Sequence, residues 1–88
     1  MNNLIDNKDV IVNKFILEPK EETGFHLHKL NYVIIPITDG VLKLVNKNNK
    51  TSIANLKSGV PYYRKAGIQH NVINNGKSKV IFIELEIK

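Results

Sequence analysis

The stretch from Gly24 to Gly40 reads GFHLHKLNYVIIPITDG, and it contains two of the chain's three histidines, His26 and His28, one residue apart. Side chains at positions i and i+2 of a β-strand point to the same side of a sheet. If this stretch begins as a strand, both imidazoles leave one face and lie close enough to share a ligand. The third histidine, His70, comes much later, on another predicted strand that a barrel can bring beside the first pair.

Short apolar segments alternate with turn signals along the whole chain, and none keeps a helical period. About eight strands at this regular spacing are typical of a sandwich or a closed barrel. Asp39-Gly40 is a strong hairpin signal between apolar flanks, and residues 80–87 alternate with one face much more apolar than the other. The predicted strands are Val10–Leu17, Phe25–His28, Asn31–Thr38, Val41–Val45, Thr51–Leu56, Pro61–Arg64, Gln69–Ile73 and Val80–Ile87.

The length of 88 residues predicts one small domain, residues 1–88, with a thin core, so we expect a homodimer. There are no cysteines to form disulfides or a thiolate metal site. The N-terminus lacks the basic and apolar segments of a signal peptide, and no apolar run is long enough to span a membrane. We therefore expect a soluble, cytoplasmic protein without a membrane partner.

The net charge of +5 does not by itself indicate nucleic-acid binding. Arg64 is the only arginine among the thirteen basic residues, and the lysines are scattered along the chain. A nucleic-acid groove more often shows clustered arginines with interleaved aromatic residues. We interpret the charge as a solvated surface and expect a small-molecule ligand, with no nucleic acid.

Three neutral imidazoles suit a divalent transition metal ion such as zinc, iron, nickel or manganese better than magnesium or calcium. The alternative is that the histidines are surface or hydrogen-bonded core residues, since an HxH pair alone is a weak signal. The whole histidine content of this chain nevertheless falls into one plausible site. The sequence therefore predicts His26, His28 and His70 as metal ligands.

The segments around these histidines resemble the two signature motifs of the cupin superfamily. The first motif has two histidines one residue apart, then a glutamate, then a glycine after six residues, and it is matched from Gly24 to Gly40 except for the glutamate. The second runs from Gly59 to Asn74 and includes His70, with Lys65 in place of the usual proline. The resemblance, spanning residues 24–74, implies an all-β, double-stranded β-helix (RmlC-like jelly-roll) cupin barrel.

A closer resemblance is to small single-domain cupins associated with β-alanine degradation, carried by TGFHLHKLNYVIIPITDG and LKSGVPYYRKAGIQHNVIN. The cupin glutamate, normally a fourth protein ligand, should fall at Val33, next to Tyr32, and neither residue is a carboxylate. The resemblance thus implies a site with three histidines and positions open for water and substrate. A degenerate cupin that holds no metal is the alternative.

Arg64 shares a strand face with Tyr62, and both are candidates for holding a substrate near the metal. A planar guanidinium binds carboxylates and phosphates through two hydrogen bonds. Alternatively, Arg64 forms a structural bridge with Glu84 or Glu86 on the last strand.

Two functions follow from these residues. One is a metal-dependent enzyme, of oxygenase, lyase or isomerase type, that acts on a small polar or acidic metabolite. The other is a non-catalytic small-molecule-binding or accessory cupin with a degenerate metal site.

Overall fold

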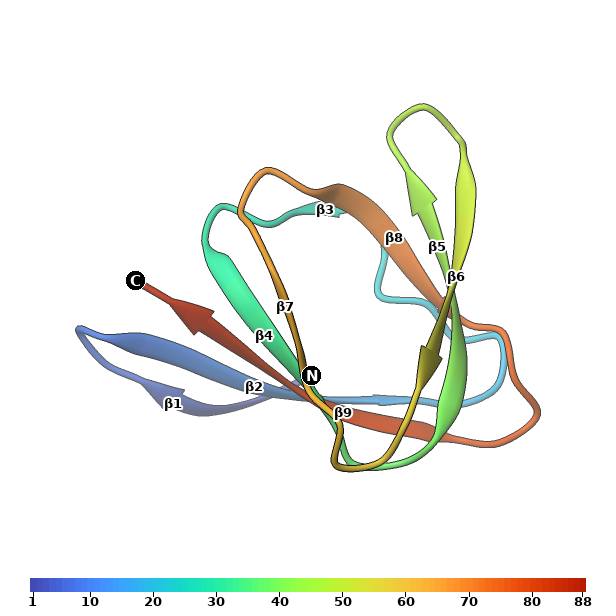
Figure 1. Ribbon diagram of the computed structural model, residues 1–88, viewed down its shortest axis with the longest axis horizontal. Coiled ribbons are helices and arrows are strands. Elements are labelled where there is room, and N and C mark those ends of the chain that lie inside the picture. The colour runs from blue at the N-terminus through green and yellow to red at the C-terminus, as the bar shows by residue number, and fades with distance from the viewer.

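A computed structural model describes all residues from Met1 to Lys88. The chain forms two antiparallel sheets that face each other as a double-stranded β-helix (Figure 1), which confirms the predicted all-β class. No helix is present that could cross a membrane. The five-stranded sheet has the order β1 (Asn2–Asp6), β2 (Val10–Leu17), β9 (Val80–Ile87), β4 (Asn31–Pro36) and β7 (Tyr62–Arg64); the four-stranded sheet has the order β3 (His26–Leu27), β8 (Gln69–Asn74), β5 (Gly40–Asn46) and β6 (Thr51–Leu56).

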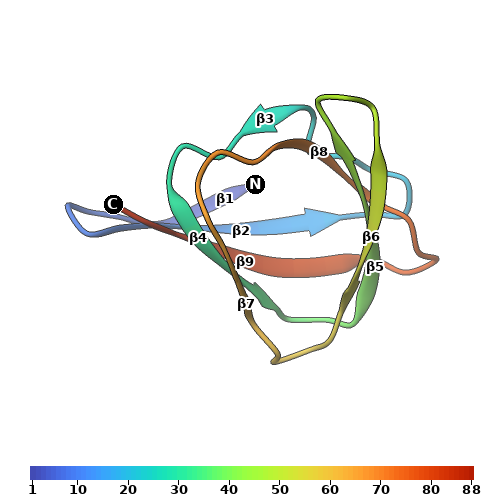
Figure 2. The same cartoon turned by 45° about the horizontal axis from the view of Figure 1, so that its top comes forward.

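Eight of these strands correspond to predicted segments, and β1 is the one the sequence did not reveal. All five residues of β1 are exposed, and the strand pairs only with β2, at the edge of the larger sheet (Figure 2). Its sequence, NNLID, has too few alternating apolar residues to stand out from a polar terminus. The strand forms because it can pair with the free edge of β2, and this contact between strands is not visible in the local sequence.

Asp39-Gly40 turns the chain, but the predicted hairpin is wrong. β4 pairs with β7 and β9, whereas β5 pairs with β6 and β8, so this turn carries the chain from one sheet to the other. Asp39 Oδ1 accepts a 2.8 Å hydrogen bond from Ser58 N, which ties this crossing to the one between β6 and β7. A side chain at Gly40 would collide with Val80. The glycine therefore serves close packing between the sheets.

The second histidine segment ends in a turn that Asn74 holds. Its side chain is fully buried and donates to Leu17 O and Ser78 O, while its Oδ1 accepts from Gly76 N. Asn74 therefore holds the turn that follows β8. The bonds also fix β8 against the start of β9 and the end of β2, so that the strand carrying His70 has a defined position.

The core lies between the two sheets, and β9 is its central strand in the larger sheet. Val80 and Phe82 point inward and are buried, and Phe82 stacks on Phe15 with ring centroids 5.1 Å apart. The inward positions of β9 also include Glu84, which is 8% exposed. The more apolar face of β9 therefore points away from the core. The buried core cluster is Leu17, Tyr32, Ile34, Leu42, Leu56, Val72, Val80 and Phe82.

Candidate metal centre

The pairing of β3 with β8 brings the distant histidines together. His26 lies directly opposite His70 in this antiparallel ladder. His28 lies just beyond the end of β3, but its backbone stays paired, because its N–H donates to Ile68 O and its carbonyl accepts from Gly67 N, both at 2.8 Å. The chain therefore keeps its alternation through His28. Both histidines of the HxH pair face the same interior as His70.

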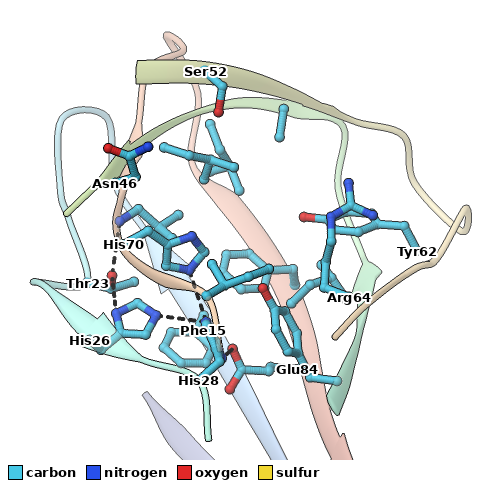
Figure 3. Close-up of a pocket in the computed structure, with 18 of the residues that line it drawn as sticks. Phe15, Thr23, His26, His28, Asn46, Ser52, Tyr62, Arg64, His70 and Glu84 are labelled. Atoms are coloured by element: carbon cyan, nitrogen blue, oxygen red, sulfur yellow. Dashed lines mark hydrogen bonds and ion pairs between the residues drawn. The ribbon is translucent and has the colours of Figure 1, made fainter. Parts of the chain in front are cut away.

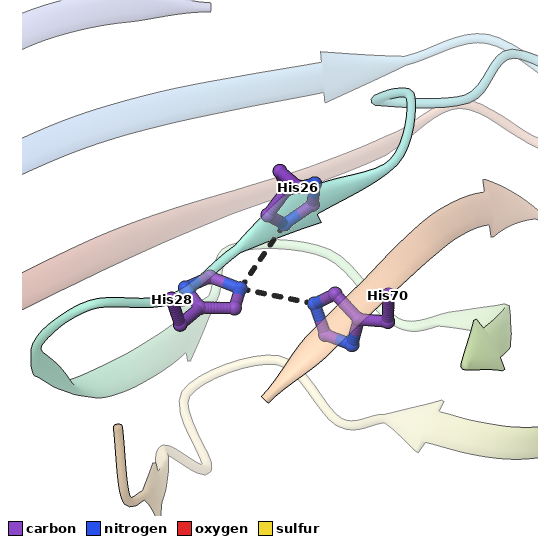
Figure 4. A group of neighbouring side chains, drawn as sticks. All are labelled: His26, His28 and His70. Carbon is purple, nitrogen blue, oxygen red and sulfur yellow. Dashed lines mark hydrogen bonds between the residues drawn. The ribbon is translucent and has the colours of Figure 1, made fainter. Parts of the chain in front are cut away.

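The three imidazoles converge through their Nε2 atoms (Figure 4). His28 Nε2 lies 3.0 Å from His26 Nε2 and 2.9 Å from His70 Nε2. The ring centroids of the three pairs are 4.7–4.9 Å apart, and the rings meet edge to face. The expected convergence of His26, His28 and His70 at one point is thus present in the fold.

The tautomer of His26 follows from its surroundings. Its Nδ1 lies 2.9 Å from Gly24 O, which can only accept a hydrogen bond. The Nδ1 atom therefore carries the proton, and Nε2 presents a lone pair toward the other two rings. Thr23 Oγ1, at 3.3 Å from the same Nδ1, supports this orientation.

Burial keeps the other two histidines in their neutral form. Desolvation, followed by the proximity of His26 and His70, lowers the pKa of His28 to about 4. Desolvation, followed by His26, lowers the pKa of His70 to about 4. Neutral imidazole is the form that binds a metal, so these side chains are available as ligands at neutral pH.

The donor set and its spacing fit one transition metal ion. Two nitrogens held at right angles by bonds of about 2.0–2.1 Å lie about 2.9 Å apart, close to the observed Nε2 separations of 2.9 and 3.0 Å. His28 Nε2 lies at hydrogen-bond distance from both other Nε2 atoms, and one proton can occupy only one of these two contacts at a time, whereas a cation between the rings can bind all three lone pairs. His26, His28 and His70 form a three-histidine group able to hold a metal ion.

The group lies in the wall of a cavity of about 290 Å³ between the sheets. Aromatic and aliphatic side chains line much of this cavity. The three histidines lie together on one part of its wall, and Tyr62 and Arg64 lie on another (Figure 3). Glu84, Tyr62 and Arg64 line the same space as the histidines. The size suits a small metabolite, since pockets for drug-sized ligands begin at roughly 300 Å³.

Comparisons with known proteins agree with this architecture. The beta-alanine degradation protein BauB of Pseudomonas aeruginosa is 45% identical over 84 residues, which cover 96% of this chain and 87% of BauB. The crystal structure of a cupin domain from Bordetella pertussis matches with a TM-score of 0.93 at 39% identity, over 99% of this chain and 90% of that one. This chain belongs to the cupin superfamily.

A more distant RmlC-like cupin from Methanocaldococcus jannaschii shares the fold, with a TM-score of 0.81 at 19% identity over 98% of this chain and 76% of that one. No family model matches the sequence. The cupin assignment therefore depends on the relatives with 45% and 39% identity.

This cupin places a tyrosine, not a carboxylate, against its histidines from β4. Tyr32 points inward, is buried, and stacks on His28 with ring centroids 4.0 Å apart. Val33, where the motif predicts the glutamate, pairs with Leu85 and Tyr63 on the outer face of the sheet. A carboxylate at Val33 would point away from the cavity. Burial, then Tyr62 and Glu84, raises the pKa of Tyr32 to about 12, so it remains a neutral phenol.

Glu84 is the functional candidate that sequence reasoning missed, having considered it only as a bridge partner for Arg64. Its Oε2 lies 3.9 Å from His28 Nδ1, on the side of the ring away from the other two histidines. This distance is too long for a direct hydrogen bond. Since His28 is neutral, the contact is not an ion pair. Burial, then Glu86, raises the pKa of Glu84 to about 7. The available signal was a carboxylate in the middle of an otherwise largely apolar strand.

Tyr62 and Arg64 both line the cavity, as the shared strand face predicts. The Arg64 guanidinium lies 4.6 Å from the centre of the Tyr62 ring and donates a 2.9 Å hydrogen bond to Tyr63 O. It forms no ion pair with Glu84 or Glu86, so the alternative of a structural bridge is wrong. Burial raises the pKa of Tyr62 despite the neighbouring arginine. Gln69, the neighbour of His70 on β8, is exposed and makes no hydrogen bond to any of the three histidine rings.

Proposed function

We propose that this cupin is a metal-dependent enzyme that acts on a small carboxylate-bearing metabolite. The observation that carries the proposal is the meeting of three Nε2 atoms in the wall of a cavity that also contains a guanidinium and a buried carboxyl group. The histidines supply a site for one divalent transition metal ion. Arg64, Tyr62 and Glu84 supply binding and proton transfer in the same cavity.

The donor set indicates the class of chemistry. Three protein ligands leave coordination positions open, and a bound zinc or nickel ion would supply Lewis acidity, whereas iron would also supply oxygen chemistry. Half of the residues that line the cavity, 10 of 20, are hydrophobic, and such a low-polarity wall strengthens electrostatic interactions with a bound substrate. Lyase, isomerase and oxygenase reactions on a small acid all fit this arrangement.

Arg64 and Tyr62 are suited to recognise the acid group of the substrate. No carboxylate of the chain pairs with the guanidinium, whose central carbon lies over the Tyr62 ring, 4.6 Å from its centre. A guanidinium so placed offers two parallel N–H groups to a carboxylate. The neutral Tyr62 hydroxyl can donate a further hydrogen bond to the same group.

Glu84 is suited to transfer a proton. A carboxyl group with a pKa of about 7 exists in both protonation states at neutral pH, which is the condition for an effective general acid or base. Its position behind His28 and beside the cavity lets it reach a substrate held near the histidines. The relation to BauB directs attention to β-alanine and other short carboxylic acids as trial substrates.

The test begins with the metal content of the purified protein, followed by chelation, reloading with zinc, iron, nickel or manganese, and turnover assays on β-alanine and short carboxylic acids. We expect reloading to restore turnover. Arg64→Met should raise KM with little change in kcat, and Glu84→Gln should lower kcat. A protein that takes up no metal ion, or a reloaded protein that turns over none of these acids, contradicts the proposal.

A second function has one observation in its favour. Tyr32 occupies the inward position of β4 next to His28, so no carboxylate joins the histidines from that strand. A cupin of this kind could bind a small acid without converting it. A carboxylate that raises the melting temperature but is recovered unchanged after prolonged incubation with the reloaded protein would favour this binding role.

A further inference from the structure

The two nitrogen atoms of the His28 ring have different neighbours. Its Nε2 lies 3.0 Å from His26 Nε2 and 2.9 Å from His70 Nε2 (Figure 4). Its Nδ1 faces Glu84, whose Oε2 lies 3.9 Å away (Figure 3). A neutral imidazole carries one proton, on Nδ1 or on Nε2, and the nitrogen that carries it needs an acceptor. The state of the metal centre therefore decides which neighbour His28 needs.

Without a metal ion, the proton of His28 belongs on Nε2. His26 presents a lone pair from its Nε2 atom, because its Nδ1–H donates to Gly24 O. Two bare lone pairs 3.0 Å apart repel each other, so the short contact between His26 and His28 requires a hydrogen between the two Nε2 atoms. His28 Nε2–H supplies it, and His28 Nδ1 then carries no proton to donate.

The proton of His28 has to change places when the site is filled. Each Nε2 atom that binds a metal ion gives it a lone pair, so His28 then carries its proton on Nδ1. For His26 the Nδ1–H group already has Gly24 O at 2.9 Å. His28 Nδ1 has no acceptor at hydrogen-bond distance, and the side chain of His28 is only 4% exposed. The new N–H group therefore needs a partner from the protein.

Glu84 is the group placed to be this partner. The carboxylate oxygen closest to a ring nitrogen of His28 is Glu84 Oε2, and Glu84 is 8% exposed. No residue donates a hydrogen bond to it, because Arg64, the cation of the same cavity, donates instead to Tyr63 O. The gap of 3.9 Å exceeds an ordinary N–H···O distance by about 1 Å. Rotation about the soft terminal torsion of the glutamate side chain can close a gap of this size.

The surroundings leave only the side chain of Glu84 to adjust. Glu84 lies within β9, between Asn13 of β2 and Ile34 of β4, so its backbone is held on both sides. Tyr32 stacks on one face of the His28 ring, with centroids 4.0 Å apart and an interplanar angle of 17°, which limits tilting of the ring. An acceptor at Nδ1 limits the remaining rotation within the plane of the ring, and thereby sets the direction of Nε2.

We propose that Glu84 is a positioning residue for the metal centre, which accepts a hydrogen bond from His28 Nδ1–H when the three histidines hold a metal ion. A carboxyl acceptor behind a ligating imidazole fixes its tautomer and makes its other nitrogen a stronger ligand. A carboxyl group has two oxygens, so the second one remains for the proton transfer proposed above. The inference rests on the metal-binding part of the proposed function and does not depend on turnover of a substrate.

Titration calorimetry of the full chain with zinc tests the proposal. Glu84→Leu removes the acceptor and should lower zinc affinity by roughly 10–100-fold. Glu84→Gln keeps an amide oxygen that can accept the same hydrogen bond, so it should recover part of this loss. The matched control is Glu86→Leu, which removes the other carboxylate near His28 and should bind zinc like the parent. Unchanged affinity in Glu84→Leu, or an equal loss in Glu86→Leu, overturns the proposal.

The same titration separates this proposal from the proposed enzyme activity. A parent protein that binds no zinc overturns the metal centre and the role of Glu84 together. A parent protein that binds zinc but turns over none of the short carboxylic acids contradicts only the enzyme activity, and the comparison of the Glu84 and Glu86 variants still decides the role of Glu84.

Nitrogen NMR of isotope-labelled histidine side chains tests the tautomer in the parent protein itself. We expect His28 to carry its proton on Nε2 in the metal-free chain and on Nδ1 after zinc is added. The Nδ1–H signal should be protected from exchange with water in the parent and in Glu84→Gln, and lost to exchange in Glu84→Leu. A zinc-loaded parent in which His28 keeps its proton on Nε2, or a protected Nδ1–H signal in Glu84→Leu, overturns the proposal.

Discussion

The two faces of β9 differ in a way that reverses the usual pattern. The inner face combines Val80 and Phe82 with a buried carboxyl group, Glu84. The outer face, with Ile83 and Leu85 at its centre, has only aliphatic side chains. In a small domain the more apolar face of a strand would ordinarily form the core. Here the inner face carries the polar groups of the cavity, and the aliphatic side chains lie on the outer face.

This difference separates two properties of the molecule. Inner-face residues should govern metal binding, chemistry and the stability of the single chain, because they line the cavity or the core. Outer-face residues should leave the metal centre and the core cluster unchanged. Substitutions on the two faces test this division.

The largest effect should come from His28→Ala on the inner side. His28 is the ring that contacts both other histidines, so its loss removes one ligand and the packing that orients the remaining two. Loss of a residue that only supports a ligand lowers metal affinity by roughly 10–100-fold, so loss of a ligand should exceed this. Titration calorimetry with zinc measures the effect. Gln69→Ala, an exposed neighbour on β8, is the control and should bind zinc like the parent.

The next effect concerns stability. Phe82→Ala removes a buried ring that stacks on Phe15 and should lower the free energy of unfolding by about 3–5 kcal/mol. Ile81→Ala, the neighbour on the outer face, should cost only about 1 kcal/mol. Chemical denaturation of the two variants and the parent measures both costs. Equal costs for the two substitutions would contradict the division between the faces.

Much of the barrel could be predicted because the local signals agree with one another. Turn residues separate short apolar runs, and the spacing of His26, His28 and His70 matches a known motif. The Asp39-Gly40 hairpin was wrong because a turn signal reports the reversal of the chain, not which sheet receives the next strand. That choice depends on contacts such as Gly40 with Val80, which are distant in sequence.

The candidate site could be predicted only in part for a similar reason. The histidines are few and follow a motif, so their convergence could be inferred. The roles of Tyr32, Val33 and Glu84 depend on which face of β4 and β9 points inward, and a strand that is apolar on both faces does not reveal this. Counting along the motif placed the missing glutamate at Val33, which points outward.

A third, smaller effect concerns Glu84 and pH in the metal-free protein. An acid whose pKa is raised from 4.5 to about 7 in the folded state destabilises that state as the pH rises through this interval. Glu84→Gln cannot ionise, so its stability relative to the parent should increase by roughly 1–3 kcal/mol between pH 4.5 and about pH 8. Urea denaturation across this range measures the difference.

His28 and His70 give the opposite slope. Their pKa values are lowered from 6.5 to about 4, so they cost stability as the pH falls from 6.5 toward 4, in the variant and the parent alike. Their contribution cancels in the comparison of Glu84→Gln with the parent. A difference that stays constant with pH would show that Glu84 ionises normally in the folded chain.

The smallest effect compares two adjacent residues of β4 with opposite orientations. Tyr32→Glu places a carboxylate on the inward side next to His28, where its charge favours a bound cation, and it should raise zinc affinity by about 10-fold over Tyr32→Gln, which has the same size without the charge. Val33→Glu places the carboxylate on the outer face, between Tyr63 and Leu85. It should leave zinc affinity unchanged, because the new charge lies on the side of the sheet away from the histidines. If Val33→Glu instead tightened zinc binding, β4 would present position 33 to the histidines, and the assignment of the two faces would be reversed.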